Sequence, residues 1–308
     1  MNRIDSWFTY GRIREDLDEE GRWYIDEVRE SQVEGSGVTL HVRVAGNPES
    51  GKVLIAINGG PGLSSGYMLD LEQFASPHFA VVTYDQRGTG RSTSPPLEAS
   101  YFSLGKYAED LEAVRQKVDV EKVHLLGHSW GGLVAMYYAT LHPERVRSLL
   151  LIGSAPPTWE GLAASFPRIN ARMQQLEQAG IVPTGLAMDD PRRREAEVRV
   201  FFSDPNFWFP ADARGSAPEF NYLVNKLTWE AVQGYDLGVE VGRLDQRVLI
   251  WWGRDDPTGL LMAYETRDTL IHAQVEFVVV EKCGHFWHER PEAFYPCVRA
   301  FLDVPSGL

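Results

Sequence analysis

Three residues of this chain have the side-chain types that serine-based nucleophilic chemistry needs: Ser129, Asp256 and His285. A serine hydroxyl is a weak nucleophile until a histidine takes its proton, and that histidine needs a carboxylate to fix its tautomer. Ser129 stands within Gly-His-Ser-Trp-Gly at positions 127–131. A bare Gly-x-Ser-x-Gly occurs by chance in about one chain in ten of this length. The sequence around the motif must therefore support it.

The flanking residues predict a strand, a sharp turn and a helix around Ser129. An apolar run at 123–126 precedes the motif, and an Ala- and Tyr-bearing segment at 133–141 follows it. Such a turn strains the backbone at the serine, and the helix packs closely behind it, so only glycine fits at Gly127 and Gly131. Ser129 would then be exposed at the positive end of the helix, where a developing oxyanion is stabilised.

Asp256 and His285 each follow an apolar run, 247–252 and 274–280, that predicts a buried strand. Both side chains should therefore emerge at the same edge of a parallel sheet as Ser129. The chain order Ser, Asp, His is that of the α/β-hydrolases. Asp255 is the competitor to Asp256 for the role of the acid.

Other histidines fit the role of the base less well. His128 lies inside the turn, and its side chain should point away from the position of the base. His285 and His288 have a spacing that a metal pair uses, but no third ligand stands at a recognisable distance along the chain. We therefore expect no metal and no cofactor.

Two further polar loops follow predicted buried strands. The strand at 53–57 leads into Asn-Gly-Gly-Pro-Gly at 58–62, a tight loop that can supply one donor of an oxyanion hole, the other being the N–H of Trp130. The strand at 79–84 leads into a glycine-rich loop at 85–92. Because this loop lacks the remaining glycine and the lysine of a phosphate loop, we expect a buried Asp–Arg network that braces the floor of the site.

The alternation of strands and helices predicts an α/β fold with a mostly parallel sheet covered on both faces. The first part of the core spans 1–155 and includes an N-terminal hairpin, with strands at 23–34 and 38–44. Residues 156–244 are mainly helical and amphipathic, which indicates an inserted lid, and 245–308 complete the core. Five aromatic residues in the lid either line the substrate pocket or form the lid's own core: Phe201, Phe202, Phe207, Trp208 and Phe209.

The composition restricts the classes of partner that the protein is expected to bind. The 308 residues have a net charge of −13 and a pI near 5.1, which argues against nucleic acid or an anionic membrane and suits a cationic small substrate. No apolar run approaches the roughly 18 residues of a membrane span, and the first residues lack the apolar core of a signal peptide. We predict a cytoplasmic protein. Its two cysteines are too few for a disulfide framework.

Taken together, the motifs at 58–62, 85–92, 127–132 and 284–285 resemble those of the proline iminopeptidase (prolyl aminopeptidase) family of α/β-hydrolases. The resemblance covers most of the chain from about Val38 and is strongest in the core. It implies that Ser129 is the nucleophile and His285 the base. The family's Gly-x-x-Asp pattern places the acid at Asp256. The resemblance also implies that the N–H groups of Gly60 and Trp130 form the oxyanion hole.

Members of this family remove an N-terminal residue, preferably proline, and hold the ammonium group of the substrate with glutamates of the lid. The stretch Glu-Phe-Asn-Tyr-Leu-Val-Asn at 219–225 resembles the one that carries such a glutamate, which implies that Glu219 binds the amine. No clear match exists for the second glutamate, for which Glu195, Glu197 and Glu230 are candidates. The chain departs from the family at Asn58, where the family usually has histidine.

The expected substrates are small peptides or aminoacyl amides, cleaved through an acyl-enzyme. Two alternatives remain. One is another α/β-hydrolase activity, on an ester, an amide or a carbon–carbon bond, because the core motifs fix the machinery and not the substrate. The other is a ligand-binding receptor on a retained hydrolase fold. The sequence leaves the oligomeric state open.

Overall fold

The computed structural model describes residues 8–10, 28–185, 191–209 and 219–304. Within these residues, nine strands form one sheet in the order β1-β2-β3-β5-β4-β6-β7-β8-β9. Their bounds are β1 Phe8–Tyr10, β2 Val28–Glu34, β3 Thr39–Gly46, β4 Val53–Ile57, β5 Ala80–Tyr84, β6 Val123–His128, β7 Val146–Ile152, β8 Arg247–Gly253 and β9 Gln274–Val280. The α-helices are α1 Leu104–Lys117, α2 Trp130–Leu141, α3 Trp159–Ala163, α4 Phe166–Gln178, α5 Pro191–Arg199, α6 Tyr222–Val232, α7 Gly238–Val241, α8 Leu260–Thr269 and α9 Pro291–Leu302.

The sheet is antiparallel at one side and parallel elsewhere. β1, β2, β3 and β5 pair antiparallel, and the six strands from β5 to β9 pair parallel. The N-terminal hairpin predicted from the sequence is present as β2 and β3, whereas residues 23–27 of its first predicted strand lie outside the described residues. The predicted mostly parallel sheet is confirmed.

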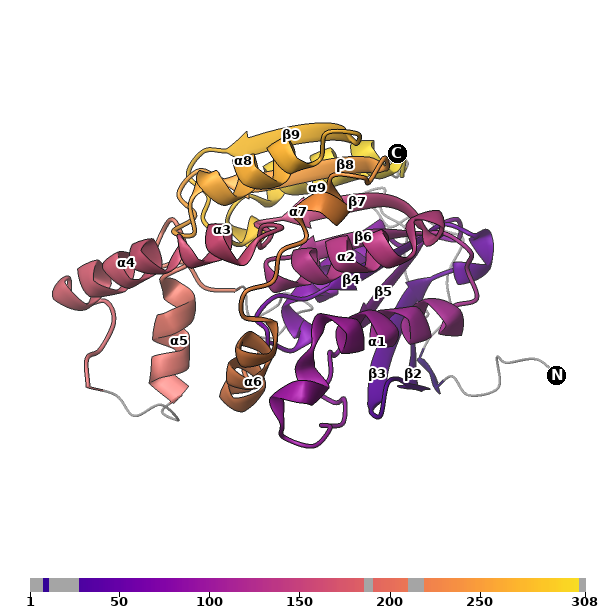
Figure 1. Cartoon of the computed structure of the whole chain (residues 1–308), viewed down its shortest axis with the longest axis horizontal. Helices are drawn as coiled ribbons and strands as arrows, with labels where there is room; N and C mark the ends of the chain where they lie inside the picture. Colours follow the sequence, from indigo (N-terminus) through magenta and orange to yellow (C-terminus); the bar gives the residue numbers. More distant parts are fainter. Residues whose placement is uncertain (1–7, 11–27, 186–190, 210–218, 305–308) are drawn as a thin grey trace.

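Helices cover both faces of the sheet, and the buried strands supply apolar side chains to each face in turn. In β4, Val53, Ile55 and Ile57 belong to a core shared with α1, α2 and α8. The alternate residues Leu54 and Ala56 belong to the opposite core, which contains α9 and the 3₁₀ helix η2, Ser65–Phe74. A strand buried on both faces has no polar side to present, which explains its unbroken apolar sequence. Figure 1 shows the sheet lying between the two layers.

The segment between β7 and β8, which we call the inserted segment, contains α3, α4, α5, α6 and α7. Figure 1 shows α4, α5 and α6 beyond the edge of the sheet, at the left of the view. The sequence pattern at 163–180 predicts one helix, and the structure has it as α4, which begins three residues later with Pro167 in its first turn. The separate short helix α3 ends at Ala163. The division of the chain at 155/156 and 244/245 remains a prediction.

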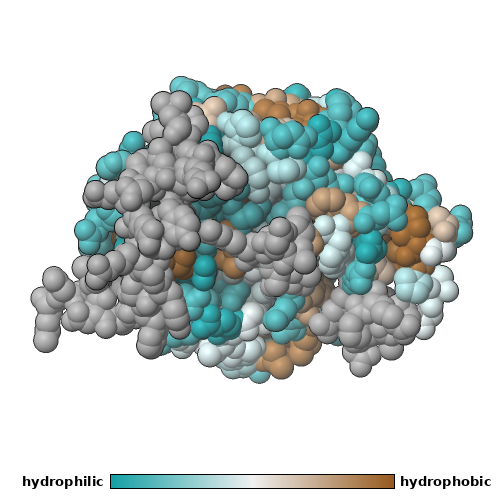
Figure 2. Space-filling view, turned by 180° about the vertical axis from the view of Figure 1, so that it is seen from behind, coloured by the Kyte–Doolittle hydropathy of each residue, from teal (hydrophilic) through white to brown (hydrophobic). Residues whose placement is uncertain are grey.

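Hydrophilic residues cover most of the coloured surface on the face drawn in Figure 2, and its hydrophobic patches are small and separated. Within the described ranges, no helix is long and apolar enough to cross a membrane.

Candidate active site

Ser129 lies at the sharp turn between β6 and α2, as the sequence predicts. Its backbone has φ 54° and ψ −120°, a strained conformation for a residue with a side chain. Two hydrogen bonds hold the turn: Ser129 N donates to Ile152 O at 2.9 Å, and Ala155 N donates to Ser129 O at 2.9 Å. A Cβ at Gly131 would come within 2.1 Å of Ile57 O. Glycine is therefore required where α2 packs against β4.

Asp256 and His285 contact each other at the carboxyl edge of the sheet. Asp256 follows β8 and His285 follows β9, and His285 Nδ1 lies 2.6 Å from Asp256 Oδ2. The other carboxylate oxygen of Asp256 accepts from the N–H and the hydroxyl of Thr258, at 2.9 and 2.7 Å. The Asp256 side chain is fully buried. It is thus oriented to hold the imidazole of His285 in one tautomer.

Asp255 lies elsewhere. Its side chain is exposed, and its Oδ2 accepts from the hydroxyl of Ser203 at 2.6 Å. The sequence leaves two aspartates in competition for the role of the acid. In the described part of the chain, Asp256 contacts His285 and Asp255 does not.

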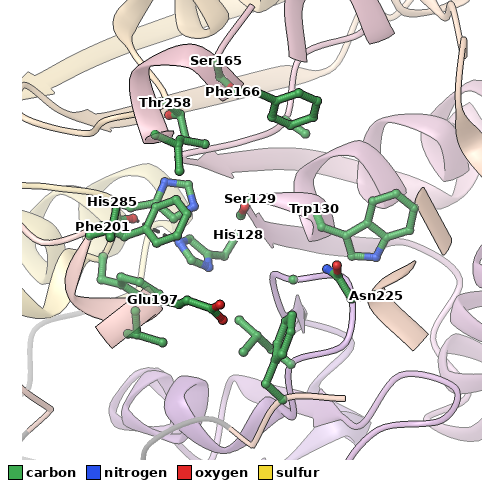
Figure 3. A pocket seen from close by; sticks show the side chains of 18 of the residues that line it. His128, Ser129, Trp130, Ser165, Phe166, Glu197, Phe201, Asn225, Thr258 and His285 are labelled. Atoms are coloured by element: carbon green, nitrogen blue, oxygen red, sulfur yellow. Dashed lines mark hydrogen bonds between the residues drawn. The ribbon is translucent and has the colours of Figure 1, made fainter. Parts of the chain in front are cut away.

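Ser129 and His285 line one cavity of about 540 Å³. Figure 3 shows both side chains pointing into it, with Trp130 and Asn225 on the other side of Ser129. The structure thus brings together Ser129, Asp256 and His285 from three loops at one edge of the sheet, although Ser129 lies more than a hundred residues before the other two in the sequence.

Gly60 and Trp130 line the same cavity. Neither backbone N–H donates to an acceptor within the described part of the chain. Gly60 has φ 119°, and a Cβ there would come within 2.7 Å of Gly62 N, so the loop requires glycine. The N–H of Trp130 opens α2, where the helix dipole favours negative charge. These two donors suit an oxyanion hole, a role that remains a prediction.

The loop at 59–64 is held from two sides. On the sheet side, Gln86 Nε2 donates to Asn58 O at 2.7 Å, and Gln86 Oε1 accepts from Trp130 Nε1 at 2.9 Å. One glutamine therefore links the residue just before this loop to the side chain of Trp130. On the side of the inserted segment, Asn225 Nδ2 donates to Pro61 O at 2.7 Å. Asn58, which stands where histidine is usual in the family, donates to Leu63 O at 2.6 Å and so keeps the loop closed.

The predicted Asp–Arg network beneath the site exists as two separate clusters. Asp85 accepts from the N–H and the hydroxyl of Ser65, at 2.9 and 2.8 Å. Arg87, which is fully buried, pairs with Asp110 of α1 through two contacts of 2.9 Å. Asp85 thus holds the segment after the 59–64 loop, while Arg87 ties the 85–92 loop to α1.

Most of the cavity wall is apolar and comes from the inserted segment. Of the five aromatic residues that the sequence singles out there, Phe201 and Trp208 line the cavity. Phe202 and Phe209 are buried in the core that contains α9, and Phe207 packs against Phe202. Further apolar lining comes from Leu162, Phe166, Ile169, Met173, Val198, Val200, Phe220, Trp229 and Met262.

Two carboxylates line the cavity, and Glu219 is not among them. Glu197 of α5 is half-buried and accepts a short hydrogen bond from the hydroxyl of Tyr222, and Figure 3 shows its carboxylate pointing into the cavity. Glu195, on the same helix, is more exposed and pairs with Arg199 at 2.6 Å.

Glu219 is exposed, its backbone pairs with Ser64, and it is not among the described residues that line the cavity. Its role in binding the amine remains a prediction. Glu230 is also exposed and outside the lining.

The structure gives no support for a metal pair at His285 and His288. The Nε2 of His288 lies 3.0 Å from Tyr67 O and 3.2 Å from Asp70 Oδ2. Within the described ranges no group of three or more His, Cys, Asp or Glu side chains could hold a metal ion.

The family model for the alpha/beta hydrolase fold matches residues 52–290. Among curated proteins, the proline iminopeptidase of Lactobacillus delbrueckii subsp. bulgaricus is 36% identical over 272 residues, which cover 83% of this chain and 90% of that protein. The chain belongs to the proline iminopeptidase family of α/β-hydrolases. The fold and the family inferred from the sequence motifs are therefore confirmed.

Solved structures show how widely this family's fold is shared. A crystal structure of the proline iminopeptidase of Mycobacterium smegmatis superposes with a TM-score of 0.65 at 21% identity, covering 89% of this chain and 97% of that one. A 2-hydroxy-6-oxo-6-phenylhexa-2,4-dienoate hydrolase from Rhodococcus superposes with a TM-score of 0.60 at 23% identity, covering 90% and 99%. At these identities the likeness extends to the fold and not to the substrate.

Several residues around the site of this proline iminopeptidase family member carried no signal in the sequence. Thr258, which contacts Asp256, belongs to no motif. Tyr222 lies in the 219–225 stretch, but its contact with Glu197 of α5 could not be read from that stretch. Gln86 lies in a loop of recognisable type, but its link to Trp130 depends on how two strands are placed in the sheet. Tyr67 lies in η2, a 3₁₀ helix without the periodicity of an α-helix.

Proposed function

We propose that this protein is a serine hydrolase that releases an N-terminal residue, preferably proline, from small peptides or aminoacyl amides. The observation that carries the proposal is the position of Glu197, a carboxylate in the wall of a mainly apolar cavity that Ser129 and His285 also line. A mainly apolar cavity with a carboxylate in its wall suits a small apolar residue that carries a positive charge. A free N-terminal amine supplies that charge.

The reaction proceeds in two steps. Ser129 Oγ attacks the carbonyl carbon of the first residue while His285 takes the hydroxyl proton, and the N–H groups of Gly60 and Trp130 bind the oxyanion. The C–N bond breaks as His285 gives the proton to the leaving amine, which leaves an ester on Ser129. Water, deprotonated by His285, hydrolyses this ester and restores the serine. Asp256 stabilises the imidazolium in both steps.

The charge on the substrate determines which end of a peptide can bind. A free ammonium pairs with Glu197, whereas an acylated N-terminus brings a neutral amide against the same carboxylate. The ammonium adds a charge-assisted hydrogen bond to this carboxylate, and burying the carboxylate against a neutral amide forgoes that bond. This penalty selects against internal peptide bonds and N-acylated residues. Tyr222 holds the carboxylate in place by its hydrogen bond.

The experiment is a comparison of four substrates with the purified protein. We expect turnover of prolyl-p-nitroanilide and slower turnover of alanyl-p-nitroanilide. N-acetylprolyl-p-nitroanilide should be slower by at least about a hundredfold in kcat/KM, and a p-nitrophenyl ester reports on the triad alone. Equal rates with the free and acetylated prolyl substrates would contradict the proposal.

The second candidate is hydrolysis of an ester or a carbon–carbon bond in an apolar substrate. The extent of the apolar lining favours it, because most of the wall offers no polar partner to a substrate. Hydrolysis of the ester without turnover of any amine-bearing amide would select this alternative.

A further inference from the structure

Four buried groups form a continuous chain of hydrogen bonds between two loops. One is the loop at 59–64, which we call the oxyanion loop, and the other is the loop after β9 that carries His285, which we call the His285 loop. Gly59 N donates to the hydroxyl of Tyr67 at 2.7 Å, and this hydroxyl lies 2.7 Å from His128 Nδ1. His128 Nε2 lies 3.1 Å from the carbonyl oxygen of His285. The chain thus runs from the residue before Gly60 to the main chain of the base, and Figure 3 shows His128 beside His285 and Ser129.

The direction of each hydrogen bond follows from the donors available. Tyr67 accepts from Gly59, so its single proton goes to His128 Nδ1. Burial holds the pKa of His128 well below its ordinary value, so the ring is neutral and carries its proton on Nε2. That proton is donated to His285 O. Burial also raises the pKa of Tyr67, which keeps its hydroxyl a donor. Every member of the chain therefore has one defined role.

The side chains that form this hydrogen-bond chain are tightly packed and shielded from solvent. Tyr67 and His128 are almost completely buried, at 1% and 0% exposure, so water cannot replace either partner. The Tyr67 ring contacts Phe286 and Trp287, which follow His285 directly. A Cβ at Gly59 would come within 2.9 Å of His128 Nδ1, so the oxyanion loop reaches the chain only because it has glycine there.

We propose that Tyr67 is a positioning residue that, through His128, fixes the oxyanion loop and the His285 loop relative to each other. It touches no reacting atom. It sets the distance between the N–H of Gly60 and the imidazole of His285, which must act on one tetrahedral carbon at the same time. The inference rests on the roles of Ser129, His285 and Gly60 in the proposed function, but not on the identity of the substrate.

Tyr67→Phe tests this role because it removes one oxygen and keeps the ring. Tyr84→Phe is the matched control: Tyr84 is equally buried, and its hydroxyl has no hydrogen-bond partner among the residues described. We expect Tyr67→Phe to lower kcat by about tenfold to a hundredfold with KM within about twofold of wild type. Tyr84→Phe should leave both constants within about twofold. A Tyr67→Phe variant as active as Tyr84→Phe, or one changed only in KM, would overturn the proposal.

A second measurement does not depend on the substrate. A fluorophosphonate probe labels an activated serine by displacement of fluoride, and its rate of reaction with Ser129 should fall in Tyr67→Phe by a factor similar to that in kcat. If wild type is labelled but cleaves no prolyl substrate, the peptidase proposal fails while the labelling rates still decide the role of Tyr67. If wild type is neither labelled nor active, both proposals fail.

His128→Ala interrupts the same hydrogen-bond chain at its other member and tests the proposal alone if Tyr67→Phe folds poorly. Where both variants fold, the single variants and the double variant form a cycle. A shared chain predicts that the double variant is about as slow as the slower single variant, because the chain is already broken. If the fold-losses in kcat of the two single variants multiply in the double variant, the two side chains act independently, which contradicts the proposal.

Discussion

The Nδ1 atom of His285 lies 2.6 Å from the Oδ2 atom of Asp256, whereas the neighbouring Asp255 is turned to Ser203. Two adjacent carboxylates thus have different surroundings. Asp256 is buried and already receives two hydrogen bonds from Thr258, which orient its free oxygen toward the imidazole. Asp255 is exposed to solvent.

Asp256→Asn should lower kcat by roughly a thousandfold to ten-thousandfold, because an amide cannot stabilise the imidazolium and favours the wrong tautomer. Asp255→Asn is the matched control and should stay within about threefold of wild type. Both are measured as kcat on the substrate that wild type turns over best. Equal losses in the two variants would show that the 2.6 Å contact has no catalytic role.

Glu197→Gln should reduce kcat/KM for amine-bearing substrates by about tenfold to a hundredfold, because it removes the charge that pairs with the ammonium. The ester substrate, which carries no amine, should be affected by less than about threefold. Glu219→Gln, at an exposed residue just before α6, is the control and should leave turnover of both substrates unchanged. A selective loss in Glu219→Gln instead would restore the prediction made from the sequence motif.

The comparison of Glu219 with Glu197 indicates what sequence alone can locate. Ser129, Asp256 and His285 were predictable because each follows a buried strand, and the ends of parallel strands meet at one edge of a sheet. The lining of the cavity depends on how the inserted segment folds over that edge. No periodicity or motif specifies that arrangement, so Glu197 was only one of three candidates.

The loop at 85–92 likewise shows which contacts can be predicted from the sequence and which cannot. Its composition indicates buried polar contacts, and Asp85 and Arg87 are both buried. The partner of Arg87 is Asp110, which lies on α1 and becomes a neighbour only when that helix packs on the sheet. A polar loop can thus be recognised from sequence, while its partners require the tertiary structure.

Stability should depend on pH through Glu112. Partial burial alone would raise the pKa of this carboxyl, but hydrogen bonds from Arg115 at 2.9 Å and Tyr138 at 2.6 Å outweigh it and hold the pKa well below its ordinary value. A carboxyl with a lowered pKa stabilises the folded state above its unfolded pKa of about 4.3, and the contribution is lost as pH falls.

Glu112→Gln should therefore lower the free energy of unfolding at pH 7 by about 1 kcal/mol. The difference from wild type should shrink as the pH falls below about 4. Urea unfolding at pH 7 and at about pH 2.5 measures both values, with Glu121→Gln, an exposed residue, as the control. A difference that is constant across this range would mean that the charge of Glu112 does not stabilise the fold.

The most direct measurement of the central claim is the turnover of prolyl-p-nitroanilide by wild type, Ser129→Ala and Ser148→Ala. Ser148 lies in β7, buried beside His124 and outside the cavity. We predict that Ser129→Ala lowers kcat by at least about ten-thousandfold with the fold intact, and that Ser148→Ala stays within about threefold. A Ser129→Ala variant that retains wild-type turnover would contradict the assignment of Ser129 as the nucleophile and, with it, the proposed function.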